Sequence, residues 1–130
     1  MKKILVIDDD RGVLGLLKSR LEKHGYQVAT AIDAIDGLAQ MLDNPPDLIT
    51  LDIMMPGIRG VDKYGSSLCE FIKKSREHKE ISVVIISIVK PGSDPVITEM
   101  VKDADAYFTK PFNTKDVIDK IDELLKAKNT

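Results

Sequence analysis

Five short apolar runs, separated by longer segments with helical periodicity, leave this chain very few possible folds. The runs cover residues 4–7, 27–31, 48–51, 83–86 and 106–108, and the second of them is the weakest. Runs that are apolar at nearly every position are typical of strands covered on both faces, as in a parallel sheet. The pattern therefore predicts an alternation of strand and helix along the whole chain.

Amphipathic segments fill the spaces between the runs. The spacing predicts five helices with the following apolar faces: Val13, Leu14, Leu17 and Leu21; Ile35, Leu38, Ala39 and Leu42; Leu68, Phe71 and Ile72; Ile97, Met100 and Val101; Val117, Ile118, Ile121, Leu124 and Leu125. Asp94, followed by Pro95, and Asn113 are predicted N-caps, and Gly25 is a predicted stop signal. Five strand–helix units predict an α/β fold: a doubly wound five-stranded parallel sheet, with helices on both faces and the flavodoxin-like order 2-1-3-4-5.

Size and charge narrow the functional class. The 130 residues suit one domain, 1–130, without a visible linker, and we expect no output domain in this chain. A net charge of −2 predicts no general attraction to nucleic acid or to an anionic membrane.

The first apolar run lasts four residues and ends in three aspartates, which is unlike a signal peptide, so we expect a cytoplasmic protein. The single cysteine, Cys69, excludes an internal disulfide and is expected to be a buried thiol.

Acidic residues follow two of the predicted strands. Asp8, Asp9 and Asp10 end the first strand, and Asp52 ends the third. In the order 2-1-3-4-5 these two strands flank the switch point of the sheet, so the carboxylates should converge there. Mg²⁺, which prefers oxygen ligands and engages phosphate, is the natural counterion. The alternatives are solvated loop residues or helix caps, and for Asp10 a cap is the preferred interpretation.

Two further side chains should lie on the same edge of the sheet. Lys110 follows the fifth strand and precedes Pro111, and Ser87 ends the fourth strand. An ammonium group and a hydroxyl group there would both suit a phosphoryl group. Taken alone, a loop lysine is usually solvated, and a serine at a strand end is usually a turn or cap residue.

The segments that carry these residues together resemble the response regulator receiver domain of two-component signal transduction, in the CheY-like superfamily. The matching segments are residues 4–10, 51–57 with Gly60, 83–87 and 105–112. The match spans nearly the whole chain, and four segments in the right order are far more specific than any one of them.

The resemblance implies a role for each matching residue. Asp52 would accept a phosphoryl group from a sensor histidine kinase or a phosphotransfer protein. Asp9, Asp52 and the backbone carbonyl of Met54 would ligate Mg²⁺, and Asp8 would act largely through water. The domain would catalyse its own phosphorylation and slow dephosphorylation without being a turnover enzyme.

The resemblance also implies a switch. Lys110 would pair with the phosphoryl group, and its bond to Pro111 would be cis. Ser87 would move to the phosphate and Tyr107 would turn inward behind it, although a plain core aromatic is the simpler interpretation of Tyr107. The surface of the fourth helix, fifth strand and fifth helix would then change and pass the signal to a downstream effector, or to a second copy in a phosphorylation-dependent homodimer.

Three features depart from the family pattern. Ile88 stands where a small residue is usual; it would narrow access to Asp52 for small phosphodonors, unless it packs away from the site. Residues 61–67 lengthen the loop before the third helix, as a partner contact or as a tolerated insertion, and Gly65 with the two serines favours loop over helix. Met54 and Val89 are apolar and unable to orient an attacking water, which predicts slow loss of the phosphoryl group.

Three other functions compete with this interpretation. An aspartyl-phosphate phosphohydrolase would use the Asp8-x-Asp10 spacing, but the nucleophile candidate Asp52 is better placed. A flavodoxin-like cofactor binder would need a phosphate loop where this chain has aspartates. A protein-interaction receiver module that works without phosphorylation is the main alternative, and Ile88 keeps it open.

Overall fold

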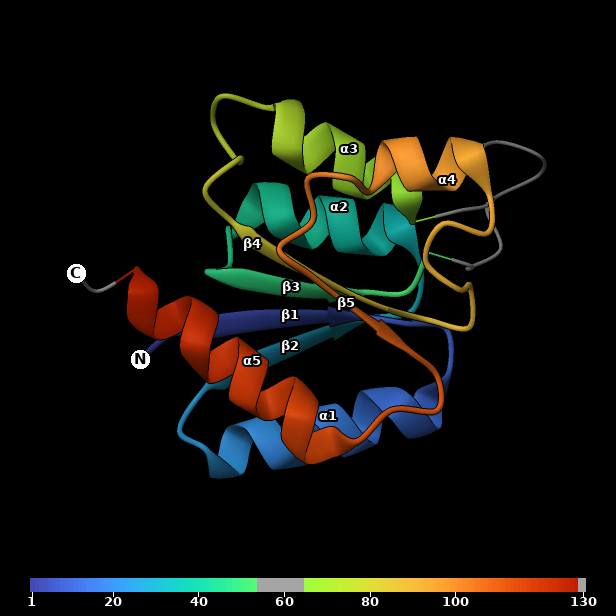
Figure 1. Cartoon of the computed structure of the whole chain (residues 1–130). Coiled ribbons are helices and arrows are strands. Elements are labelled where there is room, and N and C mark those ends of the chain that lie inside the picture. The colour runs from blue at the N-terminus through green and yellow to red at the C-terminus, as the bar shows by residue number, and fades with distance from the viewer. Residues whose placement is uncertain (54–64, 129–130) are drawn as a thin grey trace.

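The computed structural model describes residues 1–53 and 65–128 and places five parallel strands in one sheet. The sheet has the order β2-β1-β3-β4-β5, as predicted. Its strands are β1 (Lys3–Ile7), β2 (Gln27–Ala31), β3 (Leu48–Leu51), β4 (Ser82–Ser87) and β5 (Ala106–Thr109). Because all five run the same way, their carboxyl ends meet at one edge, on the right in Figure 1.

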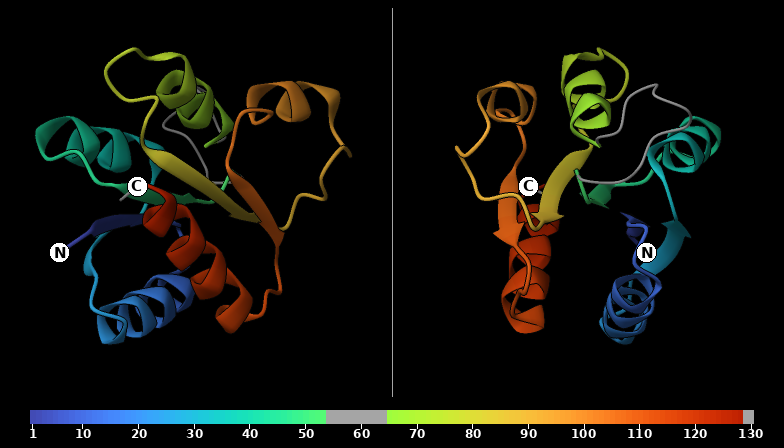
Figure 2. Two further views of the ribbon diagram at one scale, coloured as in Figure 1. Left: turned by 60° about the vertical axis from the view of Figure 1, so that its left-hand side comes forward. Right: turned by 90° about the vertical axis from the view of Figure 1, so that its right-hand side faces the viewer.

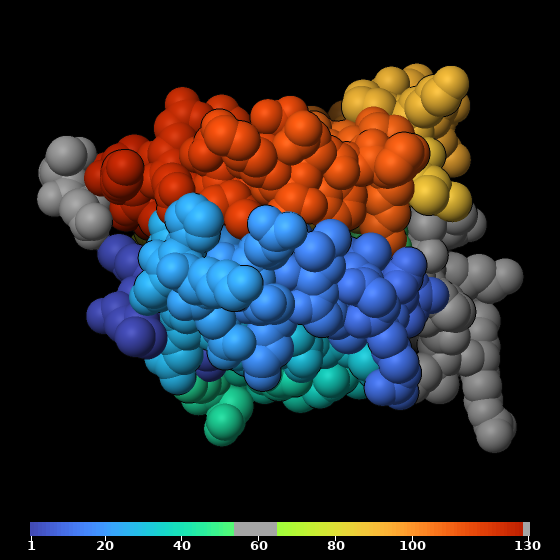
Figure 3. Space-filling model, turned by 90° about the horizontal axis from the view of Figure 1, so that it is seen from below, coloured from blue at the N-terminus to red at the C-terminus, as the bar shows by residue number. Residues whose placement is uncertain are grey.

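Helices cover both faces of the sheet. On one face lie α1 (Arg11–Lys23) and α5 (Thr114–Ala127), side by side in Figure 3. On the other face lie α2 (Ala34–Asp43), α3 (Ser66–Lys74) and α4 (Pro95–Met100), in that order across the sheet (Figure 2). Each layer encloses its own apolar cluster, one around Leu5, Ile49 and Val83 and the other around Ile4, Val6 and Val84. No helix in the described parts of the chain is long and apolar enough to cross a membrane.

The predicted helix boundaries rest on local polar contacts. The Asp10 carboxylate accepts a hydrogen bond from the Gly12 amide at 2.8 Å, so Asp10 is the N-cap of α1. Asp94 and Asn113 cap α4 and α5 in the same way. Gly25 follows α1 with a φ of 91°, a left-handed conformation that glycine adopts at little cost.

The predicted apolar face of α2 is only partly correct: Leu38 packs against the core, but the other predicted residues do not. Gly37 and Met41 are the buried residues of this helix, whereas Ile35 and Leu42 are each more than half exposed. The glycine sets the orientation, because a Cβ atom at Gly37 would lie 2.4 Å from Cδ1 of Ile7. A helix that approaches β1 this closely turns Gly37 and Met41 to the sheet and leaves Ile35 and Leu42 on the outward side.

The start of α3 also differs from the prediction. Ser66 and Ser67 were expected in a loop, yet α3 begins at Ser66 and Gly65 is its N-cap residue. Serine is compatible with the first turn of a helix, and Ser66 is fully buried there by tertiary packing. Residues 61–64 of the expected insertion lie outside the described residues.

Candidate functional site

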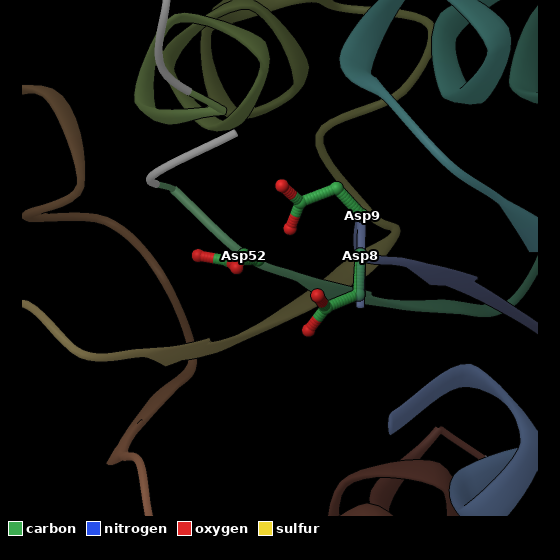
Figure 4. A group of neighbouring side chains, drawn as sticks. All are labelled: Asp8, Asp9 and Asp52. Carbon is green, nitrogen blue, oxygen red and sulfur yellow. The ribbon is translucent and has the colours of Figure 1, made fainter. Parts of the chain in front are cut away.

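Three carboxylates converge at the carboxyl ends of β1 and β3. The Asp52 amide donates to the Ile7 carbonyl at 3.0 Å, which fixes Asp52 beside the end of β1. One carboxylate oxygen from each of Asp8, Asp9 and Asp52 lies within 4.8 Å of the others (Figure 4). Asp8 and Asp52 are buried and Asp9 is exposed, so the cluster opens to solvent on the Asp9 side.

Lys110 brings a positive charge to this cluster. Its amide donates to the Ser87 carbonyl at 2.8 Å, which extends the pairing of β4 and β5 to the edge of the sheet. Its Nζ atom lies 2.8 Å from Oδ2 of Asp8 and 3.1 Å from Oδ2 of Asp52. Among the residues that the structure describes, Lys110 is therefore the cation that contacts both buried carboxylates.

Burial and pairing act in opposite directions on the pKa values in this site. Burial raises the pKa of Asp8, and the hydrogen bond from Lys110 only partly offsets this effect. Burial would lower the pKa of Lys110, but its hydrogen bond to Asp8 and the charge of Asp52 raise that pKa above the ordinary value of 10.5. Lys110 therefore stays charged at neutral pH, and the cluster of three carboxylates and one ammonium group retains an excess of negative charge.

The donor set fits a hard divalent cation. It consists of oxygen atoms only, two of its carboxylates are buried, and a single lysine does not balance three negative charges. Carboxylates gathered in this way suit Mg²⁺, which binds one or two of them and keeps several water ligands. The expected contribution of the Met54 carbonyl lies outside the described residues.

Ser87 and Tyr107 both bond to the backbone of Val89. Ser87 is fully buried, and its Oγ atom accepts a hydrogen bond from the Val89 amide at 3.2 Å. The Tyr107 hydroxyl donates to the Val89 carbonyl at 2.5 Å. Burial raises the pKa of Tyr107, and the charge of Asp52 adds to this shift. Side-chain patterns could not indicate that Val89 connects the two residues, because the contacts use its backbone and not its side chain.

Two further expectations concern Ile88, whose direction was left open, and the peptide bond between Lys110 and Pro111, which was expected to be cis. Ile88 is 66% exposed, so its side chain does not pack into the core. The peptide bond between Lys110 and Pro111 is cis.

The start of α3 lies against the backbone of Asp52. A Cβ atom at Gly65 would be 2.4 Å from the Asp52 carbonyl oxygen and 2.9 Å from Cδ1 of Leu51. Only glycine permits this approach, so Gly65 determines how closely α3 packs behind the site. Sequence reasoning missed this role, because it treated Gly65 only as a loop signal.

A groove of about 310 Å³ flanks the site between α1 and the segment before α5. Its lining is mostly apolar and reaches Lys110; the residues are Asp10, Gly12, Val13, Leu16, Lys110, Pro111 and Phe112. The groove lies on the side of the sheet covered by α1 and α5.

Comparisons with known proteins all identify response regulators as relatives of this chain. A family model of the response regulator receiver domain matches residues 4–122. The alkaline phosphatase synthesis transcriptional regulatory protein PhoP of Bacillus subtilis is 33% identical over 125 residues, which are 96% of this chain and 49% of that protein. The transcriptional regulatory protein CpxR of Klebsiella pneumoniae is 34% identical over 126 residues, or 97% of this chain and 50% of that protein. The chain thus spans about half the length of the curated relatives it matches.

Solved structures agree with the sequence comparison. A response regulator receiver domain protein from Methanospirillum hungatei matches with a TM-score of 0.82 and 31% identity, covering 99% of this chain and 97% of that one. The response regulator TrrA from Thermotoga maritima, solved in complex with Mg²⁺-BeF, matches with a TM-score of 0.79 and 31% identity, covering 95% and 99% of the two chains.

Proposed function

Because this chain belongs to the response regulator receiver family, whose function is phosphorylation-dependent signalling, we propose that Asp52 is its phosphoacceptor. The observation that carries the proposal is the convergence of Asp8, Asp9, Asp52 and Lys110 at one edge of the sheet. We further propose that Asp8, Asp9 and Asp52, with the Met54 carbonyl, hold Mg²⁺. When bound, the ion neutralises the negative charge that gathers during phosphoryl transfer.

In the transfer step, a carboxylate oxygen of Asp52 attacks phosphorus and the bond from phosphorus to the donor imidazole nitrogen breaks. The electron pair of that bond stays on the imidazole, and Asp52 becomes an aspartyl phosphate. The protein has little covalent work to do in such a reaction beyond positioning and charge stabilisation. Lys110, already 3.1 Å from Asp52, stabilises the charge on the phosphoryl oxygens.

Ser87 and Tyr107 respond to the phosphoryl group. The Ser87 Oγ atom accepts a hydrogen bond from the Val89 amide. The hydroxyl proton of Ser87 can therefore be donated to a phosphoryl oxygen. A move of Ser87 toward the phosphate releases one of the two bonds that hold Val89, and Tyr107 holds the other. The signal would therefore pass from β4 to β5 and change the surface of α4, β5 and α5, which a downstream effector recognises.

The donor is a protein, a histidine kinase or a phosphotransfer protein. The apolar groove beside Lys110 supports this choice, because it offers a docking surface next to Asp52 that a small phosphodonor would not use. Exposed Ile88 follows Ser87 at the end of β4 and would hinder donors that cannot displace it. Like other receiver domains, the chain is not a turnover enzyme; it takes one phosphoryl group and loses it slowly.

Intact-mass measurement tests this proposal. The protein is incubated with a phosphorylated histidine kinase domain or with acetyl phosphate, in Mg²⁺ or in EDTA. We expect one phosphoryl adduct that requires Mg²⁺ and is absent from Asp52→Asn. The kinase should phosphorylate the protein more efficiently than acetyl phosphate does. Ile88→Ala should reduce this difference between the two donors. An Asp122→Asn control, which leaves the site unchanged, should behave like the parent. If no adduct forms with either donor or with Ile88→Ala, the phosphorylation-independent interaction module is the correct function.

A further inference from the structure

The helix α2 has apolar residues on two sides, and only one of them is covered. Gly37 and Met41 face the sheet, while Ile35, Ala39 and Leu42 are exposed. Large exposed apolar side chains number eight in the described parts of the chain, and three of them, Ile32, Ile35 and Leu42, fall within eleven residues around this helix. A helix that is apolar on both sides is normally covered on both.

The exposed residues form a regular stripe. Ile35, Ala39 and Leu42, here called the α2 stripe, follow one another at spacings of four and three residues, the spacing of a helix–helix seam. Ile35 and Leu42 are 52% and 53% exposed. Gln40 bonds through Nε2 to the Thr30 carbonyl of β2, so the opposite flank, which carries the stripe, turns away from that strand. The stripe therefore has the form of a surface that receives another helix.

The charges of α2 specify the partner. The segment 32–44 contains Asp33, Asp36 and Asp43 and no lysine or arginine. Asp33 caps the helix, and Asp36 lies in its first turn, where a negative charge also stabilises the helix. Asp43 ends the helix at the negative end of its dipole, whereas the last turns of α1, α3 and α5 carry lysine or arginine. A residue that weakens its own helix is a candidate for an intermolecular contact.

We propose that the α2 stripe binds an amphipathic helix of a partner protein, with apolar residues in the seam and lysine or arginine on its flanks. Basic flanks would pair with Asp36 and Asp43 beside the seam. A second copy of this chain fits poorly, because two α2 helices would bring like charges together. An anionic membrane fits poorly for the same reason. This surface is separate from the phosphorylation site, and the proposal does not depend on the proposed function.

Two fluorescent synthetic peptides test the proposal by anisotropy. Both have the same leucine seam at alternating three- and four-residue spacing, and one has lysine flanks while the other has glutamate flanks. We expect the protein to bind the lysine-flanked peptide at least about fivefold more tightly, because two or three partly exposed charge pairs favour it. Replacing Ile35 and Leu42 together by glutamine should weaken this binding more than about tenfold. Val96→Gln changes an exposed apolar residue on α4, outside the α2 stripe, and as the control it should leave this binding unchanged.

Asp43→Lys distinguishes a loss of peptide binding from a loss of stability. It should weaken binding of the lysine-flanked peptide about threefold, strengthen binding of the glutamate-flanked peptide, and raise the thermal midpoint of the domain. Equal binding of the two peptides, no binding of either, or binding unchanged by Ile35→Gln with Leu42→Gln would overturn the proposal. So would self-association in sedimentation experiments, or binding to phosphatidylserine vesicles, if Ile35→Gln with Leu42→Gln abolished it, because the stripe would then serve a second copy or a membrane.

Discussion

The Nζ atom of Lys110 lies 3.1 Å from an Oδ atom of Asp52, although 58 residues separate them in the chain. The same Nζ atom lies 2.8 Å from Asp8. One lysine thus offsets the repulsion of two buried carboxylates before any phosphoryl group arrives, and it is already in position to meet that group. If Asp52 is the phosphoacceptor, as proposed, stability and phosphoryl transfer depend on the same contact.

Lys110→Met should lower both the stability of the domain and its phosphorylation. Methionine keeps much of the apolar stem but leaves Asp8 buried without its cation, and the pKa of Asp8 should rise further. We expect a loss of about 2 kcal/mol in the free energy of unfolding and a lower yield of phosphorylated protein. Urea denaturation and intact mass measure the two effects. Lys115→Met, which removes a solvent-exposed pair with Asp119, should leave the free energy of unfolding almost unchanged. Equal losses in the two variants would contradict the role of Lys110.

Ser87→Ala and Tyr107→Phe should be coupled through Val89. Each removes one of the two bonds on the Val89 backbone, and each should cost about 1 kcal/mol in unfolding free energy. Because both bonds hold the same residue, the double variant should differ from the sum of the single variants by at least about 0.5 kcal/mol. A double-mutant cycle in urea measures this difference, with Tyr26→Phe in place of Tyr107→Phe as the uncoupled control. Additive losses would mean that Val89 does not transmit between β4 and β5.

Gly65→Ala and Gly15→Ala should have opposite effects. The methyl group at Gly65 meets the Asp52 backbone at 2.4 Å, so α3 must shift, at a cost of about 1–3 kcal/mol and a loss of phosphorylation. A Cβ atom at Gly15, inside α1, meets nothing within 4 Å and should stabilise the domain by about 0.5–1 kcal/mol. Thermal unfolding and intact mass measure both. A Gly65→Ala variant as stable and as readily phosphorylated as the parent would show that α3 need not pack so closely.

The thiol of Cys69 should be inert in the folded protein. Burial is the main cause that raises its pKa from 9.0 to about 12. A thiol pKa raised by folding contributes stability that is complete below pH 9 and is lost as the pH rises toward 12, by up to about 1.4 kcal/mol per pH unit. Stability of the parent should therefore fall more steeply than that of Cys69→Ala across this range. Iodoacetamide at pH 8 should label the parent only when denaturant is present, and rapid labelling without it would refute the prediction.

Sequence patterns predicted most of this architecture, because strand burial and capping are local signals. The second strand was predicted at residues 27–31 and lies there, and Asp10, Asp94 and Asn113 cap the helices they precede. The convergence of the acidic residues with Lys110 followed from strand order alone.

Tertiary packing decided the features that sequence reasoning missed. The predicted face of α2 was wrong at Ile35 and Leu42, because the helix turns Gly37 toward Ile7 and hydrophobic periodicity gives glycine no weight. Ser66 entered α3 for a similar reason, since Gly65 places that turn against Asp52. The role of Val89 rests on backbone groups, which every residue has, so side-chain identity could not indicate it.

The parallel sheet has one consequence for quality control in the cell. Asp8, Asp52 and Lys110 come from the first, third and fifth strands and meet only when β1, β3, β4 and β5 are all paired. If this cluster is the phosphorylation site, as proposed, a truncated, misfolded or half-synthesised chain has no site, so it would neither take a phosphoryl group nor draw one away from intact molecules. Under the proposed function, the amount of phosphorylated protein would depend only on the number of correctly folded copies, whatever the total amount of chain.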